Sequence, residues 1–188
     1  GLDLGFMNNS LTVGFDWFQR ENRDMLAPAQ VLPDVVGASA PYENAGTLRT
    51  RGWELSLNWN HRFGDVDVYA NFNIGDAKSV VTKWRNDSKL LSSTYAGQNY
   101  GDIWGFETER YFTEDDFNGQ NADGSWNYKE GVASQVGIQT DNFVYGPGDI
   151  KYKDLNGDGV IDGGKGTADD HGDLKVIGNT MPRYEYSF

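Results

Sequence analysis

The chain has 188 residues, enough for one ordinary domain or for part of a larger protein. Its formal net charge of −12 argues against nucleic acid as a partner, because phosphate binding needs basic patches. The absence of cysteine excludes disulfides, thiolate metal sites and cysteine nucleophiles. Aromatic residues make up 14% of the chain, which is too much for a disordered tail.

Alternating apolar and polar residues predict a hairpin at the start of the chain. Residues 2–6 and 11–17 both alternate in this way, as strands with two unlike faces do. Asn8-Asn9-Ser10 lies between them, and asparagine tolerates the positive φ of a tight turn. Residues 25–46 follow and contain three prolines, so we expect a loop there.

A second hairpin is predicted from longer alternating runs. Residues 53–63 and 66–74 each place apolar side chains on one face and polar ones on the other, about a short turn at Gly64-Asp65. The residues from about 82 to 182 are expected to form one long loop region, with short strands or packed aromatics at 100–112 and 126–128.

Three details favour a membrane barrel over a soluble sandwich. The polar face is almost wholly Asn, Ser, Asp, Glu and Arg, as a wet lumen requires. Trp59, Phe63 and Tyr69 lie near the short turn, where an interfacial aromatic girdle belongs. The connections alternate between short and long, as periplasmic turns and extracellular loops do.

The predicted fold is therefore all-β, with antiparallel strands and long extracellular loops from part of a transmembrane β-barrel. Its expected organisation is barrel hairpins over 1–81 with the loop at 25–46, a loop region over 82–182, and the start of the next strand at 183–188. Both ends fall within strand-like patterns, which indicates roughly five strands from inside a longer protein.

An acidic loop carries the most informative motif. In Asp154-Leu155-Asn156-Gly157-Asp158-Gly159-Val160-Ile161-Asp162, oxygen-bearing side chains recur at alternate positions, and Gly159 lies where a calcium loop of the EF-hand type turns. Lys165 stands where the last carboxylate is expected, so the glycine-rich residues 163–166 would have to bring in Asp169, Asp170 or Asp173. The predicted ligands of a structural Ca²⁺ are Asp154, Asn156, Asp158, the Val160 carbonyl, Asp162 and Asp173. The alternative is an Asx-turn loop that hydrogen-bonds to its own backbone.

Other candidate chemistry in the long loop is weaker. The carboxylates between Glu107 and Asp116 include possible acid/base pairs of a glycosidase, but a solvated acidic loop explains them better. We therefore expect no enzyme. The aromatic side chains expected to face a ligand or partner are Trp104, Tyr111, Trp126 and Tyr128. Packing of the loop onto itself is the alternative for most of the loop aromatics.

Several segments, taken in order, resemble the C-terminal half of SusC/RagA-type TonB-dependent outer-membrane transporters. They are Gly14-Phe15-Asp16-Trp17-Phe18-Gln19-Arg20 running to Asp24-Met25-Leu26, Asn44-Ala45-Gly46, Arg51-Gly52-Trp53-Glu54-Leu55, Gly101-Asp102-Ile103-Trp104-Gly105-Phe106, Pro147-Gly148-Asp149-Ile150-Lys151-Tyr152-Lys153 leading into the acidic loop, and Ile177-Gly178-Asn179-Thr180-Met181-Pro182-Arg183-Tyr184. Their order and spacing over nearly the whole chain make the resemblance specific, although no single piece would suffice.

The resemblance implies a barrel of about 22 strands with a plugged lumen. It implies import of glycans, peptides or other large nutrients, powered by TonB through an N-terminal part that this chain lacks. The implied partners are outer-membrane lipid and a SusD-like surface lipoprotein, and the implied location is the outer membrane of a Gram-negative bacterium with loops 25–46 and 82–182 outside. The competing function is a soluble, secreted calcium- and carbohydrate-binding β-sandwich.

Overall fold

The computed structural model describes residues 1–28, 42–140 and 143–188. These residues form β-strands and short 3₁₀ turns. In this described part, no helix has the length and apolar character needed to cross a membrane. The chain divides into two compact units, one of residues 1–87, 94–101 and 180–188, and one of residues 88–93 and 102–179.

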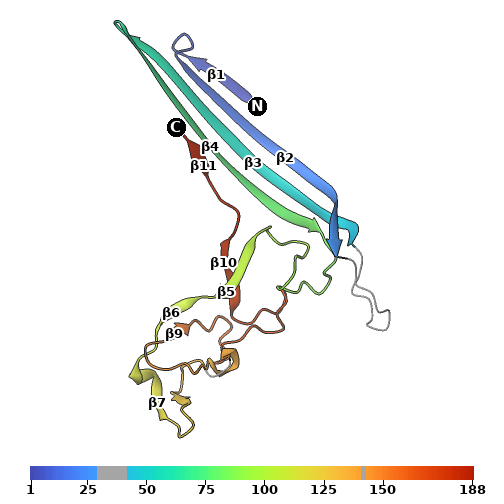
Figure 1. Ribbon diagram of the computed structural model, residues 1–188, viewed down its shortest axis with the longest axis vertical. Helices are drawn as coiled ribbons and strands as arrows, with labels where there is room; N and C mark the ends of the chain where they lie inside the picture. Colours follow the sequence, from blue (N-terminus) through green and yellow to red (C-terminus); the bar gives the residue numbers. More distant parts are fainter. Residues whose placement is uncertain (29–41, 141–142) are drawn as a thin grey trace. The chain divides into compact units, whose positions relative to one another are not determined.

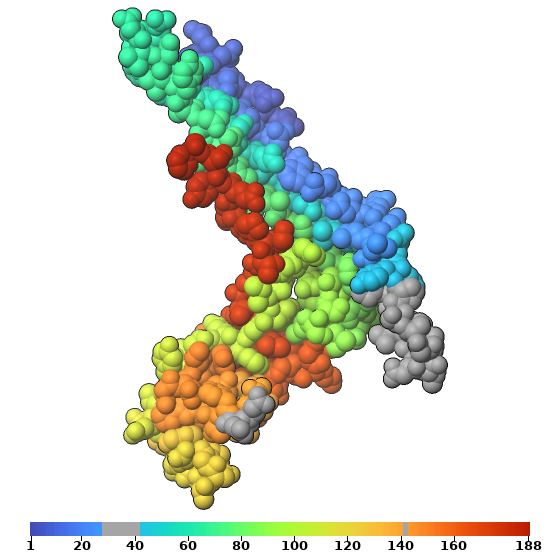
Figure 2. Space-filling view, viewed as in Figure 1, coloured from blue at the N-terminus to red at the C-terminus, as the bar shows by residue number. Residues whose placement is uncertain are grey.

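The first unit is an antiparallel sheet of five strands in the order β1-β2-β3-β4-β11 (Figure 1). The strands are β1 (Leu2–Phe6), β2 (Leu11–Pro28), β3 (Tyr42–Phe63), β4 (Val66–Lys83) and β11 (Glu185–Ser187). In Figure 2 the end of the chain, coloured red, lies against the green edge formed by β4. Among its described residues this unit has no second sheet.

Asparagine and glycine occupy positive-φ positions in the two short turns, although Met7 also has φ 55° in the first. Asn8 and Asn9 adopt positive φ values of 54° and 65°, which asparagine tolerates better than most residues. Gly64 adopts φ 62° at the turn between β3 and β4, where the missing Cβ removes the steric cost. Both hairpins predicted from the alternation are therefore present.

The loop predicted at 25–46 is too long at both ends. β2 continues to Pro28 and β3 begins at Tyr42, so residues 25–28 and 42–46 are paired strand residues. Asp24 has φ 54° and the register shifts between Asn22 and Met25, so a bulge interrupts the ladder without ending it. The rest of the predicted loop, 29–41, lies outside the described residues.

The second unit consists of short antiparallel pairs joined by turns. They are β5 (Asp102–Phe106) with β10 (Leu174–Asn179), β6 (Thr108–Tyr111) with β9 (Ile150–Tyr152), and β7 (Phe117–Gln120) with β8 (Trp126–Tyr128). Two 3₁₀ turns, η2 (Glu114–Asp116) and η3 (Val136–Ile138), lie between them. Phe112, Phe117 and Ile161 are buried at its centre. The second unit thus has buried side chains of its own, with the short strands predicted in this region, whereas residues 82–87, 94–101 and 180–182 belong to the first unit.

Candidate functional site

The sheet of the first unit has one apolar and one polar face. Strand pairing aligns the alternation of each strand with that of its neighbours, because residues directly opposite each other in an antiparallel pair share a face. The row Phe15, Leu55 and Ile74 is one example, continued by Tyr186 on β11. The apolar face carries Leu2, Leu4, Phe6, Leu11, Val13, Phe15, Trp17, Trp53, Leu55, Leu57, Trp59, His61, Phe63, Val66, Val68, Ala70, Phe72, Ile74 and Tyr186.

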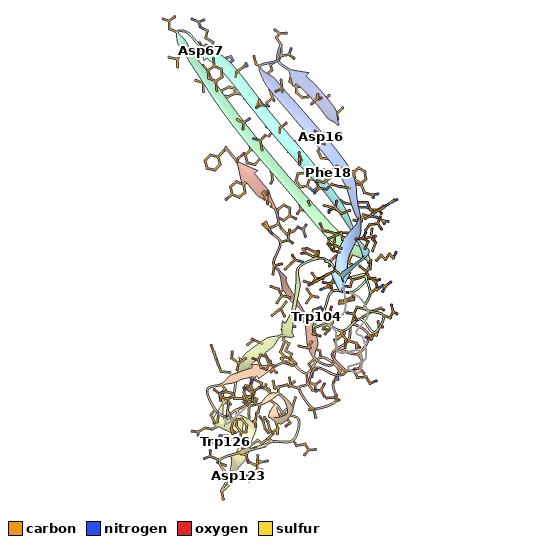
Figure 3. All side chains as sticks on the ribbon, turned by 45° about the vertical axis from the view of Figure 1, so that its right-hand side comes forward. Asp16, Phe18, Asp67, Trp104, Asp123 and Trp126 are labelled. Atoms are coloured by element: carbon orange, nitrogen blue, oxygen red, sulfur yellow. The ribbon has the colours of Figure 1, made fainter. Side chains whose placement is uncertain are left out.

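The opposite face is polar over the same length. Asp16 lies opposite Glu54, and Asn58 lies opposite Asn71. Asn71 Nδ2 donates to Asn58 Oδ1 at 2.5 Å, and Asn73 Nδ2 donates to Asn71 Oδ1 at 2.8 Å, so amides form a ladder across the sheet. In Figure 3, Asp67 lies at the short-turn end of the sheet and Asp16 lies partway along β2.

The apolar face is not the wall of a closed core. Trp17 is 60% exposed and Phe63 is 57% exposed. A soluble globule would bury the apolar side chains of this face in its core. Four of them are only half-buried: Trp53, Leu55, Leu57 and Val68. The unit therefore presents a broad uncovered apolar surface, which marks a protein or membrane contact.

The acidic loop of the second unit is held by its own backbone. Asp154 Oδ1 accepts from the Gly157 N–H at 2.6 Å, and its Oδ2 accepts from the Gly159 N–H at 2.8 Å. Asp158 Oδ1 accepts from the Val160 N–H at 2.8 Å. Asn156 and Asp162 make the same kind of bond, two residues onward in each case. The bonds of Asn156, Asp158 and Asp162 are Asx turns, in which a side chain accepts from the N–H two residues on. Asp154 instead accepts from N–H groups three and five residues on.

Asp173, which follows the acidic loop in the sequence, is hydrogen-bonded to both ends of it. Its side chain is fully buried, and its Oδ1 accepts from the Leu155 N–H at 2.6 Å while its Oδ2 accepts from the Asp162 N–H at 3.1 Å. Asp169 and Asp170 instead pair with Lys89 and Lys165. Of the three carboxylates that the glycine-rich residues 163–166 were expected to bring in, Asp173 is the one that reaches the loop.

The loop geometry matches the self-bonded alternative. Across the described residues, no three His, Asp or Glu side chains converge as metal ligands. Ile161 packs inward with no exposed surface. Calcium binding at Asp154, Asn156, Asp158, Val160, Asp162 and Asp173 stays a prediction.

The four selected aromatic side chains lie in different surroundings. Trp126 packs against Phe117 with ring centroids 5.2 Å apart, and Tyr128 packs against Phe117 at 5.1 Å. Trp104 packs against the His171 ring at 5.3 Å. Tyr111 is different, because it is 66% exposed. Three of them thus contact other rings of the unit and Tyr111 is exposed, and a ligand-facing or partner-facing role of the four stays a prediction.

Two ion-pair clusters organise the carboxylates of the long loop. Arg110 donates to both oxygens of the buried Asp116, at 2.6 and 2.5 Å, and this bond holds the pKa of Asp116 well below its usual value. Lys153 Nζ donates to Glu107 at 2.6 Å and Lys175 also donates to it, which lowers the pKa of Glu107 to about 2. A glycosidase acid needs a raised pKa, so neither carboxylate fits that role.

Sequence reasoning missed Gln135. Its side chain is fully buried, accepts from the Tyr152 N–H at 2.7 Å and donates to the Ile150 carbonyl at 3.1 Å. It therefore satisfies the backbone of β9 on the side away from β6. A single glutamine in a loop gives no pattern from which this contact could be found.

Comparison with known proteins finds similarity to TonB-dependent receptors. No family model matches it. It is 27% identical to "TonB-dependent receptor P3" of Formosa agariphila over the whole of this chain and 18% of that protein. It is 26% identical to "TonB-dependent receptor P26" of the same organism, again over the whole chain and over 17% of the relative. The chain thus spans less than a fifth of the length of either relative.

Solved structures show the same fold. The RagAB peptide importer in its "closed-closed" state matches 70% of this chain with a TM-score of 0.50 and 20% identity, over 16% of that chain. Its "open-open" state matches 66% with a TM-score of 0.50 and 21% identity, over 15% of that chain. The resemblance found in the sequence is confirmed: over its whole length this chain is similar to one part of TonB-dependent receptors, and over 66–70% of its length it shares the fold of the RagAB importer.

Proposed function

We propose that the chain forms part of the barrel wall and the extracellular loops of a TonB-dependent outer-membrane importer of glycans, peptides or other large nutrients. The observation that supports this most is the division of the five-stranded sheet into an apolar and a polar face. In a barrel, the first face would meet lipid and the second would line a wet lumen.

The length of the apolar face fits a bilayer. On β3 it runs from Phe63 near the short turn to Trp53. Ten residue steps extend roughly 33 Å along a strand. A tilt of about 40° reduces this to a height of about 25 Å, which is the apolar band of an outer-membrane barrel. Aromatic residues stand at both ends, with Trp59 and Phe63 at one and Trp17 and Trp53 at the other.

Partners of the whole protein follow from the family resemblance. TonB would act through parts of the protein other than this chain, and a SusD-like surface lipoprotein would cover the extracellular side. The solved structures that share this fold are those of a peptide importer, which favours peptides within the proposed substrate class. This chain would contribute wall and loops, without transport activity of its own.

A structural calcium ion on the acidic loop is the second part of the proposal. The donors are hard carboxylate, amide and carbonyl oxygens, which suit Ca²⁺. The buried Asp173 already joins the two ends of the segment 155–162. The ion would then further stabilise a loop that its own backbone hydrogen bonds already hold together, so the role of the ion would be structural.

The soluble β-sandwich is not favoured. A sandwich needs a second sheet over the apolar face, and the described residues of this unit supply none. The curated relatives are receptors of one type over the full length of the chain.

Cysteine labelling tests the proposed facing of the strands. The chain has no cysteine, so a single substitution introduces the one thiol in this part of the protein, and any cysteine elsewhere in the whole protein is replaced by serine. In the whole barrel protein reconstituted in liposomes, Leu57→Cys should react poorly with a water-soluble maleimide, and a probe placed there should be quenched by nitroxide lipids. Asn58→Cys, the next residue on the same strand, should show the reverse. Equal water access at both positions would contradict the barrel.

A further inference from the structure

A basic row crosses the outward face just beyond the apolar band. Arg51 on β3 lies directly opposite Lys78 on β4 and Gln19 on β2. The preceding row on the same face is Trp17, Trp53 and Asp76, because side chains two residues apart share a face. The basic row is therefore roughly 7 Å further along the strands than the Trp17–Trp53 boundary.

The basic row lies on the side of the apolar band that faces the outer leaflet in the proposed barrel. From Trp53, β3 runs through the apolar band to the short turn at Gly64, and the opposite direction leads to Tyr42 and the long connections. Long connections are the extracellular loops of such barrels. Arg51 and Lys78 thus lie at the depth of the lipid headgroups in the outer leaflet.

The charge of Arg51 and Lys78 is not compensated by the carboxylates around them. Arg49 donates to Glu21 at 3.1 and 3.0 Å, and Arg183 is paired with Asp76. No ion pair joins Arg51 or Lys78 to a carboxylate of the described residues, and both side chains are exposed.

The guanidinium of Arg51 is already oriented. Its Nε donates to Gln19 Oε1 at 2.8 Å, a neutral partner that fixes the side chain along the row without neutralising it. The Nη atoms stay able to donate two parallel hydrogen bonds, the geometry that suits phosphate oxygens. Lys78 adds a flexible point charge next to it.

We propose that Arg51 and Lys78 bind the phosphate group of a lipid headgroup in the outer leaflet. The apolar band below the row would receive the acyl chains of the same lipid, which distinguishes this ligand from free phosphate. The row places positive charge at the membrane surface on a chain whose formal net charge is −12, and this local charge would attract an anionic headgroup. The inference rests on the proposed function, since it needs the apolar face to meet lipid.

Lipid binding to the whole barrel protein tests the site. Diphosphoryl lipid A and phosphatidylcholine serve as probes, with bound lipids counted by native mass spectrometry and stability followed by thermal unfolding. Wild type should prefer lipid A and unfold at a higher temperature with it. Arg51→Gln and Lys78→Gln should each lose roughly fivefold in lipid A affinity. Arg62→Gln is the matched control, since Arg62 belongs to the polar face near the short turn.

The outcomes separate this proposal from the proposed function. Insertion of wild type into bilayers with no preference for lipid A, or a preference unchanged in Arg51→Gln/Lys78→Gln, would overturn the phosphate site alone. Failure of wild type to insert into any bilayer would overturn the proposed function. Displacement of lipid A by millimolar inorganic phosphate would show a plain anion site and also overturn the proposal. Unfolding in phosphatidylcholine at the wild-type temperature shows that the variants fold.

Discussion

At the scale of single residues, one buried carboxylate holds the acidic loop together. Asp173 is fully buried and accepts from backbone N–H groups on both sides of the loop, at Leu155 and Asp162. A buried carboxylate is stable only when hydrogen bonds replace its water. Asp173 is thus more important for the loop than the motif carboxylates, which lie nearer to solvent.

Substitution of Asp173 should open the loop. Asp173→Ala leaves the N–H groups of Leu155 and Asp162 without their acceptor, at a cost of about 2 kcal/mol in the stability of the second unit. Amide hydrogen exchange at Leu155 and Asp162 should accelerate strongly. Asp169→Ala is the control, because its side chain is 72% exposed and pairs only with Lys89. Equal exchange rates in the two variants would contradict the role of Asp173.

Asp158 distinguishes a calcium site from a self-bonded turn. Its carboxylate is exposed in the loop and accepts from the Val160 N–H and from Asn156 Nδ2. If the loop binds calcium, Asp158→Ala should lower terbium affinity and increase proteolysis of the loop. A terbium titration and a digestion pattern both identical to wild type would support the Asx turns alone, without a cation.

At the scale of elements, a strand could be predicted from the sequence where the alternation of apolar and polar residues was the one pattern present. The alternation in 53–63 and 66–74 gave β3 and β4 and their facing, because a period of two is a property of the strand itself. The ends of β2 and β3 were not predictable, since Pro28 and the bulge near Asp24 both imitate loop signals. The β5–β10 pairing was also out of reach, because contacts between residues 102 and 179 follow from the fold and not from local pattern.

The acidic loop, too, was predictable in its local spacing but not in its contacts with residues distant in the sequence. The spacing from Asp154 to Asp162 fixed a tight oxygen-rich turn, and the structure has that turn. Three carboxylates after the glycine-rich insert were equivalent in the sequence. Burial selects Asp173, since it alone of the three lies inside the unit.

Glu107 joins the elements of the second unit in a pH-dependent way. It follows β5 and binds Lys153, just after β9, and Lys175 on β10. The two lysines lower the pKa of Glu107 from 4.5 to about 2. The ionised carboxylate therefore stabilises the unit above pH 4.5, and this contribution is lost as the pH falls towards 2.

Glu107→Gln should remove part of this acid sensitivity. The measurement is hydrogen exchange of the β5 and β10 amides from neutral pH down to pH 2. After correction for the intrinsic exchange rate, exchange should accelerate less on acidification in the variant than in wild type. At neutral pH the variant should be the less stable of the two. Glu130→Gln, at an exposed position of the same unit, is the control. If the pH dependence of exchange were the same in Glu107→Gln as in wild type, the lysine contacts would not hold β9 and β10 to this carboxylate.

At the scale of the whole molecule, the first unit has apolar surface and strand edges that no other described residue of that unit covers. β1 and β11 are the edge strands of the sheet, and each leaves one row of backbone groups unpaired. Trp17, Phe63 and Val66 are exposed on the apolar face. In a complete barrel, neighbouring strands would pair with both edges and lipid would cover the face.

The excised chain should therefore depend on detergent. In plain buffer we expect association and strong binding of a dye for apolar surface, whereas micelles should give a dispersed species with high strand content by circular dichroism. Residues 102–179 alone are the internal control, because their core around Phe112, Phe117 and Ile161 is their own, and they should stay monomeric in buffer. A full chain that is monomeric without detergent, with as little dye binding as this control, would contradict the membrane role. It would mean that the apolar face is covered by protein, because side chains such as Trp17 cannot remain in water over so large an area without association.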